Sequence, residues 1–276
     1  TDDNSYAHWF PGVHGRYDVG RFSFVGSWSN TIQRPYFGSV VPFRHVNRES
    51  RFIDAGNPDL KPTLYTNYDF AIDYKIDDDD LMSIELFYQT VEDIVYYEVS
   101  VIEGGNYDGF ERGTNRNGPS ADIYGARLIW NQSLGSWWDP AEGLSFSVTY
   151  THQVSETEYP GRPGETLPLP RRPENTLEAS LKYDRFGIFA QLEVDYEESA
   201  LKGINDNEPW RDRHGTSQTW VKLNGSYALT DAYRVFFEVY NVTNTRRGED
   251  YYADGTLLRD YGWGPRGYKF GLKFDL

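Results

Sequence analysis

The sequence predicts an all-β fold, a transmembrane antiparallel β-barrel, and three observations carry that prediction. Apolar side chains recur at every second position in many short segments, which is the period of a strand with one oily and one polar face. The 276 residues contain no apolar run of about 18 residues or more, the length that a transmembrane helix needs. Short and long connections alternate along the chain, which is typical of bacterial outer-membrane barrels.

About ten segments show the two-residue period clearly enough to be predicted as strands. In the last of them, Tyr268, Phe270, Leu272, Phe274 and Leu276 alternate with lysine, glycine and aspartate. Such an oily face needs lipid or a cover, because an exposed apolar edge strand invites aggregation in water. In chain order the predicted strands are 22–28, 68–76, 82–88, 124–130, 144–150, 177–183, 188–196, 221–229, 233–239 and 268–276.

The connections between these strands are of two kinds. Short polar turns are predicted at 77–80, 134–143, 184–185 and 230–232. Long loops rich in Gly, Pro, Asn, Asp and Arg are predicted at 31–65, 92–121, 152–174, 198–218 and 241–266. In outer-membrane barrels the short turns face the periplasm and the long loops face outside. The acidic run at 77–80 is therefore expected to be a solvated periplasmic turn.

Aromatic residues are abundant and lie near the ends of the predicted strands. The chain has 22 Tyr, 16 Phe and 8 Trp, a bias that suits strands and membrane interfaces rather than a helical bundle. The positions that we expect in an interfacial girdle are Tyr74, Tyr88, Trp137, Trp138, Tyr150, Tyr183, Trp220 and Tyr233.

Composition argues against several classes of function. The formal net charge is −15, whereas a nucleic-acid surface needs concentrated Lys and Arg. The absence of cysteine removes thiolate catalysis and Cys-ligated metals. The five histidines lack metal-binding spacing, and no motif of a serine hydrolase or a phosphate-binding loop occurs. We therefore expect no enzyme activity, no catalytic residue, no cofactor, no metal and no nucleic-acid partner.

Several motifs together resemble the TonB-dependent outer-membrane receptors. "NPDLKPTLYTNYDFAIDYKI" at 57–76, followed by "LMSIELFYQTVEDIVYY" at 81–97, is similar to that family's NPxLKPE…NYELGLEY…ALFYxxIxDxI pattern, with Thr63 in place of Glu. "WSNTIQRPYF" at 28–37, "SADIYGARLIW" at 120–130 and "EVYNVTNTRR" at 238–247 resemble further family segments, with Arg127 in place of a Glu. The resemblance covers most of residues 17–276.

The resemblance implies the place of this chain in a larger protein. Large transporters of this type close 22 strands around a plugged lumen, so residues 1–276 are expected to form the C-terminal portion of the barrel. The plug and the N-terminal strands would belong to the same receptor or to a separate chain. The implied partners are outer-membrane lipid, the TonB complex acting through the missing N-terminal part, the outer-membrane assembly machinery and a small-molecule or glycan ligand. The implied location is the bacterial outer membrane, and the C-terminal strand ending at Leu276 resembles the family's assembly signal.

The best candidates for ligand recognition lie in the last two long loops. Aromatic rings mixed with Arg and Asp suit sugars, and aromatic rings with Arg also suit anionic iron chelates. The candidate residues are Trp210, Arg211, Arg213, Tyr251, Tyr252, Arg259, Asp260, Tyr261 and Trp263. The family resemblance implies a receptor fragment for energised uptake of a scarce nutrient. The resemblance of "NTIQRPYF" to receptors linked with glycans slightly favours a carbohydrate over an iron siderophore. The alternative to a nutrient receptor is a soluble all-β domain that binds or hydrolyses carbohydrate.

Overall fold

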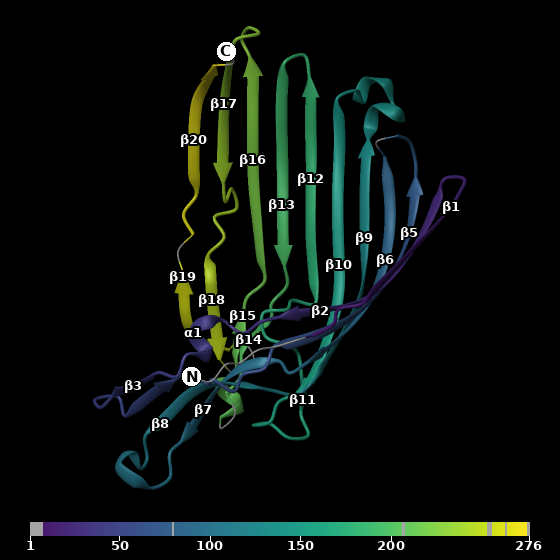
Figure 1. The fold of residues 1–276 in the computed structure, drawn as a ribbon. Helices are drawn as coiled ribbons and strands as arrows, with labels where there is room; N and C mark the ends of the chain where they lie inside the picture. Colours follow the sequence, from purple (N-terminus) through teal and green to yellow (C-terminus); the bar gives the residue numbers. More distant parts are fainter. Residues whose placement is uncertain (1–7, 79, 206–207, 253–255, 263, 275–276) are drawn as a thin grey trace.

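The main element of the protein, here described from a computed structural model, is one large curved antiparallel sheet (Figure 1). The structure describes residues 8–78, 80–205, 208–252, 256–262 and 264–274. Each strand pairs with the next along the path β1-β2-β5-β6-β9-β10-β12-β13-β16-β17-β20. Their bounds are Gly12–Val19, Phe22–Gln33, Thr63–Lys75, Leu81–Glu92, Ala121–Ser133, Leu144–Glu158, Asn175–Arg185, Ile188–Glu197, Gln218–Ala228, Tyr233–Tyr240 and Gly267–Phe274.

The ten predicted strands are all present, and the structure adds an eleventh, β1, that the sequence analysis missed. Its apolar side chains do alternate, at Val13, Tyr17 and Val19, and each is exposed. Gly15 interrupts the series, so the periodic signal was too weak to notice. β1 pairs with β2 from Gly12 opposite Ser29 to Val19 opposite Phe22.

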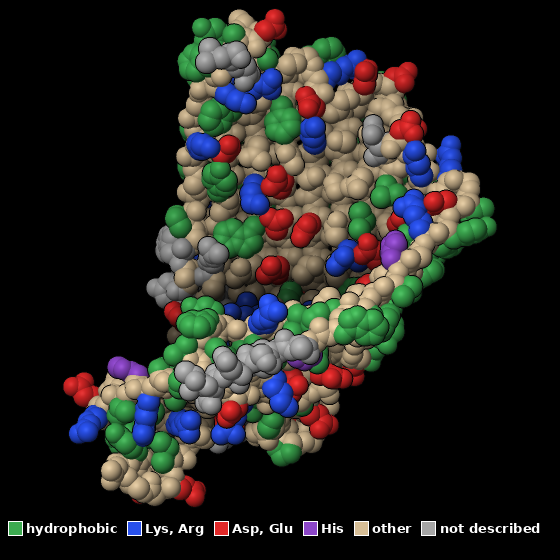
Figure 2. Space-filling view, in the orientation of Figure 1, with side chains coloured by type: hydrophobic (Ala, Val, Ile, Leu, Met, Phe, Trp, Pro, Cys, Tyr) green, Lys and Arg blue, Asp and Glu red, His purple; other side chains and the backbone are tan. Residues whose placement is uncertain are grey.

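The two faces of the sheet differ as the alternation predicts. On the convex face Phe237 lies opposite Phe270, and these side chains are 36% and 73% exposed. On the concave face Lys222 forms ion pairs with Glu193 and Asp195 at 3.5 and 3.1 Å. Figure 2 looks into this concave face and shows acidic and basic side chains distributed over it. A wall that is oily outside and charged inside suits lipid on one side and a wet lumen on the other.

The short connections all lie at one rim, uppermost in Figure 1. One of them includes the 3-10 turns η2 (Leu134–Ser136) and η3 (Asp139–Ala141). The predicted turn at 184–185 is wrong by two residues, because Asp184 and Arg185 still pair within the β12–β13 ladder. The turn is Phe186–Gly187, and both residues have positive φ, which a tight two-residue hairpin favours.

The long connections are less irregular than the sequence suggested. Four of their strands form a small sheet in the order β3-β4-β8-β7, in which β4 and β8 are parallel. Another four form the order β14-β15-β18-β19, and the short strand β11 pairs with the end of β10. The bounds are β3 Arg44–Asn47, β4 Phe52–Ala55, β7 Val95–Val101, β8 Glu111–Asn117, β11 Thr166–Leu167, β14 Leu201–Gly203, β15 Arg213–Gly215, β18 Arg247–Tyr252 and β19 Leu257–Gly262.

Helical structure is confined to these connections and to the turns. The long connections hold one helix, α1 (Phe37–Val40), and the 3-10 turns η1 (Gly105–Tyr107) and η4 (Pro209–Arg211). In the part of the chain that the structure describes, no helix has the length and apolar character needed to cross a membrane.

The dry core lies at the rim that carries the long loops, not in the middle of the wall. Val91, Ala121, Ile123 and Leu169 are buried together there, with Phe87 among the side chains packed against them. Leu169 comes from the connection between β10 and β12, so this core fastens that connection to the ends of β6 and β9. This long connection is therefore packed onto the wall.

The acidic turn at 77–80 is not wholly solvated, contrary to the expectation. Asp80 is only 3% exposed, and its carboxylate accepts hydrogen bonds from the backbone N–H of Ser133 at 2.7 Å and from the buried side-chain amide of Gln132. The hydroxyl of Ser136 donates to the same carboxylate at 3.3 Å. Asp80 thus joins the β5–β6 turn to the β9–β10 turn. Asp78, by contrast, is 93% exposed and pairs with Lys75.

The C-terminal strand keeps its predicted phase. Tyr268, Phe270, Leu272 and Phe274 are all exposed on the convex side, and β20 pairs with β17 along its whole length. Leu276 lies outside the described residues. The assembly-signal role of this strand stays a prediction.

A first prediction concerns the lipid-facing side of the wall. We expect Phe237→Arg in the complete protein to reduce the fraction that folds in the membrane, because Arg at a mid-membrane lipid-facing site costs about 2–4 kcal/mol. Asn224→Arg is the matched control, since Asn224 faces the lumen opposite Glu238 and the new charge finds a partner there. Heat-modifiable gel mobility measures the folded fraction of each variant. Equal yields of the two variants would overturn the assigned phase of β16 and β17.

A second prediction concerns the buried carboxylate at the short-turn rim. Asp80→Ala leaves the Ser133 N–H and the Gln132 amide without their acceptor, which costs about 1–3 kcal/mol. We expect a lower unfolding midpoint for this variant in a heat-modifiability titration. Asp78→Ala in the same turn is the control and should shift the midpoint little, because an exposed ion pair contributes about 0–1 kcal/mol. A larger shift for Asp78→Ala than for Asp80→Ala would contradict the assignment.

Candidate ligand-binding site

A cavity of about 1030 Å³ opens at the rim of the long loops. Its walls come from β7 and β8, from the connection between β10 and β12, and from the segment that carries β14, η4 and β15. The residues that line it are Phe52, Tyr65, Val91, Ile94, Val95, Tyr96, Tyr97, Val99, Glu111, Tyr159, Leu169, Pro170, Arg171, Arg172, Lys202, Gly203, Ile204, Asn205, Glu208, Arg211 and Arg213. We call this space the mouth cavity.

Cations outnumber acids in the lining of the mouth cavity. The basic side chains are Arg171, Arg172, Lys202, Arg211 and Arg213, whereas the acidic ones are Glu111 and Glu208. Arg211 pairs with Glu208 at 2.8 Å. Among the ion pairs of the described residues, none joins Arg171, Arg172, Lys202 or Arg213 to a carboxylate. These charges are therefore available to an anionic ligand.

Aromatic rings complete the lining. Tyr65, Tyr96, Tyr97 and Tyr159 all face this space. The hydroxyl of Tyr97 donates to Asp54 at 3.2 Å, and burial raises the pKa of Tyr97, as does the nearby Asp54 charge. Tyr97 therefore remains a neutral hydrogen-bonding ring at physiological pH. Rings beside guanidinium groups offer both stacking and charge to a flat anionic ligand.

One connection carries much of the site, and we call residues 159–172 the strap. β11 within it pairs with β10, and the backbone N–H of Leu169 donates to the hydroxyl of Ser155 at 3.0 Å. The backbone N–H of Arg171 donates to the carbonyl of Leu201 at 2.6 Å, which joins the strap to β14. Arg171 and Arg172 are thereby held at the wall of the mouth cavity.

Arg162 is the most buried cation of the strap, at 7% exposure. Its Nε donates to Glu165 Oε1 at 3.0 Å, and its Nη1 donates to Asp212 Oδ2 at 3.0 Å. The same Nη1 donates to the carbonyl of Asn205 at 3.3 Å. The hydrogen bonds with Glu165 raise the pKa of Arg162 and lower the pKa of Glu165. The guanidinium of Arg162 is thus bonded to groups of the protein itself, and Arg162 is not among the residues that line the mouth cavity.

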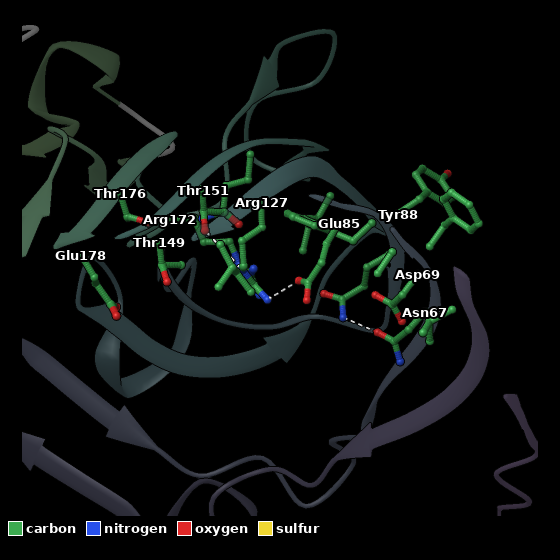
Figure 3. A pocket seen from close by; sticks show the side chains of 18 residues that line it. Asn67, Asp69, Glu85, Tyr88, Arg127, Thr149, Thr151, Arg172, Thr176 and Glu178 are labelled. Atoms are coloured by element: carbon green, nitrogen blue, oxygen red, sulfur yellow. Dashed lines mark hydrogen bonds and ion pairs between the residues drawn. The ribbon is translucent and has the colours of Figure 1, made fainter. Parts of the chain in front are cut away.

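A second hollow of about 820 Å³ lies on the concave wall of the sheet, and we call it the wall hollow (Figure 3). There Arg127 Nη1 donates to Glu85 Oε2 at 2.9 Å and Arg127 Nε donates to the hydroxyl of Thr151 at 3.3 Å. Asp69 and Glu178 add two further carboxylates to the lining. Arg172 lines both the wall hollow and the mouth cavity, so the two spaces meet at this side chain.

The predicted site residues divide between the mouth cavity and its neighbourhood. Arg211 and Arg213 line the cavity. The Trp210 ring packs edge-on to Tyr252 at 6.3 Å, and Arg259 Nε donates to the Tyr252 hydroxyl at 2.9 Å.

The remaining candidates lie on or beyond this cluster. Tyr251 and Asp260 lie on β18 and β19, outside the cavity lining. The side chain of Tyr261 and the whole of Trp263 lie outside the described residues. Among the described residues, no group of three or more His, Cys, Asp or Glu side chains could hold a metal ion.

Sequence reasoning missed most of the site, since only Arg211 and Arg213 of the cavity lining were among the candidates. Arg171 and Arg172 stand between two prolines in "PRRP", and Tyr96 and Tyr97 form a pair just after a predicted strand. A paired Arg and a paired Tyr in two long loops were a usable signal. What the sequence did not show was that these loops lie beside β14 and β15.

Comparison with known proteins agrees with this architecture. The model of the outer membrane protein beta-barrel family matches residues 1–210. The chain belongs to that family. The iron-regulated outer membrane virulence protein of Vibrio cholerae serotype O1 is 26% identical over 285 residues, a match that covers 100% of this chain and 40% of that protein. The predicted outer-membrane location is confirmed.

Several solved structures have the same fold as this chain. A variant of the ferric enterobactin receptor of Pseudomonas aeruginosa superposes with a TM-score of 0.70 at 16% identity, over 97% of this chain and 40% of that one. The siderophore receptor PirA of Acinetobacter baumannii gives a TM-score of 0.68 at 15% identity, over 99% and 41%. The copper transporter OprC gives 0.65 at 15% identity, over 95% and 39%. The predicted fold class and the resemblance to TonB-dependent receptors are confirmed, and the chain spans about two fifths of the length of these relatives.

A third prediction follows from the lowered pKa of Glu165. A carboxyl whose folded pKa is lowered stabilises the folded segment above its unfolded pKa, and this contribution is lost as pH falls through the folded value. The ordinary value is 4.5, so we expect the strap to loosen below that pH. Hydrogen exchange of 159–172 in the complete protein, corrected for intrinsic rates, measures the loosening. Glu165→Gln is the control and should flatten this part of the pH profile; an unchanged profile would contradict the role of Glu165.

Proposed function

We propose that this chain forms part of the wall and mouth of a receptor that takes up an anionic iron chelate of the siderophore class. The observation that carries the proposal is the lining of the mouth cavity, where five basic side chains and four tyrosines surround a space of about 1030 Å³. A ferric chelate with acidic oxygen donors carries net negative charge on a compact, partly aromatic body. Guanidinium forks and rings match both properties.

The relatives support the same reading. The V. cholerae relative is an iron-regulated outer membrane virulence protein, and the structural relatives include receptors for ferric enterobactin and siderophores. The carbohydrate preference that we drew from the sequence finds no support among these names. A carbohydrate site also has no need for several unpaired cations, since neutral sugars are held by rings and by neutral or acidic hydrogen-bonding groups.

We further propose that residues 1–276 are a C-terminal portion of the complete barrel. β1 and β20 end the sheet, and each has one described neighbour only. An unpaired backbone N–H or C=O group costs several kcal/mol in hydrocarbon, because no water is there to bond it. Both edges of the sheet therefore need further strands. The remaining strands and a plug within the curve of the sheet would complete the receptor, and the TonB complex would drive release through that plug. The protein's chemistry would be binding and gating, with no bond made or broken in the ligand.

A fourth prediction tests the ligand class. In the complete receptor we expect ferric enterobactin to bind and Arg213→Ala to weaken it about tenfold or more, since a hydrogen bond to a charged group contributes about 1.5–3 kcal/mol. Intrinsic fluorescence quenching on purified receptor measures the affinity. Because Arg213 has no carboxylate partner among the ion pairs of the described residues, its loss leaves no described acidic group unpaired.

Two controls make the test specific. Arg48→Ala removes an exposed cation that does not line the mouth cavity, and affinity should stay at the wild-type value. A neutral maltooligosaccharide serves as the competing ligand class. Tighter binding of the sugar than of the chelate, or equal effects of Arg213→Ala and Arg48→Ala, would refute the proposal.

A further inference from the structure

The segment that presents Arg211 and Arg213 to the mouth cavity is held from behind by one buried acid. Arg211 and Arg213 line the cavity, whereas Asp212 between them is 8% exposed and its carboxylate bonds to Arg162 of the strap. Neighbouring residues thus point in opposite directions, two toward the ligand space and one into the protein. Asp212 is not among the residues that line the mouth cavity.

Asp212 also closes its own loop. Its Oδ1 accepts the backbone N–H of Asn205 at 2.8 Å, and the side-chain oxygen of Asn205 accepts the N–H of Glu208 at 2.8 Å. Arg162 Nη1 reaches the Asn205 carbonyl at 3.3 Å as well as both Asp212 oxygens, at 3.2 and 3.0 Å. One guanidinium therefore fastens both ends of the turn that contains η4.

The other side of Arg162 is fixed to the strap. Glu165 accepts from Nε at 3.0 Å, and the backbone N–H of Arg162 donates to the Tyr159 carbonyl at 2.9 Å. Tyr159, Arg171 and Arg172 of the same strap line the cavity. Two segments that are far apart in sequence are thus joined by a pair at 7% and 8% exposure, where solvent screening is weak.

We propose that Arg162 and Asp212 are positioning residues for the ligand, which set the directions of Arg211 and Arg213 without touching it. This inference rests on the proposed uptake of an anionic chelate. Long arginine side chains lose conformational freedom when they bind, and a held backbone reduces that cost before the ligand arrives. The pair thereby raises affinity through preorganisation.

The direction in which Asp212→Ala changes ligand affinity distinguishes a positioning role of Asp212 from a purely electrostatic one. Removing an acid close to the cavity strengthens the attraction for an anion, so charge alone predicts tighter binding of ferric enterobactin. Loss of positioning predicts weaker binding, by roughly tenfold for two loosened arginines. Glu111→Gln is the matched control for charge, because Glu111 lines the cavity and holds neither segment. Loss of its charge should tighten binding.

The experiment uses the complete receptor, with assembly checked by heat-modifiable mobility and affinity measured by fluorescence quenching. We expect Asp212→Ala to weaken binding while Glu111→Gln does not, and we expect Asp212→Ala to add little in an Arg211→Ala/Arg213→Ala background. Binding by Asp212→Ala as tight as wild type, or a full additional loss in that background, would overturn the proposal. If Asp212→Ala does not assemble, Arg162→Lys takes its place, since an ammonium lacks the planar fork by which Arg162 reaches Glu165 through Nε and Asp212 and Asn205 through Nη1. The same outcomes then decide.

Failure of the proposed function would look different. If the wild-type receptor does not bind ferric enterobactin, the proposed ligand class is refuted. The claim that Arg162 and Asp212 hold the segment of Arg211 and Arg213 is then tested by hydrogen exchange. In that case, faster exchange at Asn205 and at 208–212 in Asp212→Ala supports the positioning pair, and unchanged exchange there refutes it.

Discussion

The need to pair every backbone N–H and C=O within hydrocarbon governs this structure. Along the wall path, each strand from β2 to β17 is paired on both sides, so the wall leaves no interior edge in lipid. Once pairing fixes the strands side by side, alternation alone assigns one face to lipid and the other to the lumen. Beyond the membrane, water satisfies the backbone, and the chain there is free to form parallel pairs such as β4 with β8. The pairing requirement thus gives the wall a repetitive structure, whereas the long connections at the mouth form pairs that are particular to this chain.

The wall was predictable because its information is local. A two-residue period shows in any short window, and ten of the eleven wall strands follow from it. β1 was missed where Gly15 removes one apolar position from the series, and the β12–β13 turn was misplaced because positive φ at Phe186 is not visible in composition. The burial of Asp80 could not be predicted either, because it depends on Gln132 and Ser133, which lie more than fifty residues away in the sequence.

The mouth was less predictable because its information is not local. Arg211 and Arg213 were identified from residue type, yet Arg171, Arg172 and Lys202 were not, although they are of the same type. Residue type marks a side chain as suitable for recognition, and only the packing of the strap against β14 shows which suitable side chains converge. The hydrogen bond from Arg171 N–H to the Leu201 carbonyl is one of the contacts that bring them together.

The two hollows that meet at Arg172 differ in charge, and this difference bears on transport. Basic side chains dominate the mouth cavity, whereas Arg127 in the wall hollow is already paired with Glu85 and lies near Asp69 and Glu178. An anion held at the mouth gains no electrostatic energy by moving down this wall. In the proposed receptor, capture and release would therefore be separate steps. The mouth cavity would bind the ligand, and onward movement would need a change in whatever faces the wall, which the proposed plug would supply with energy from outside the barrel.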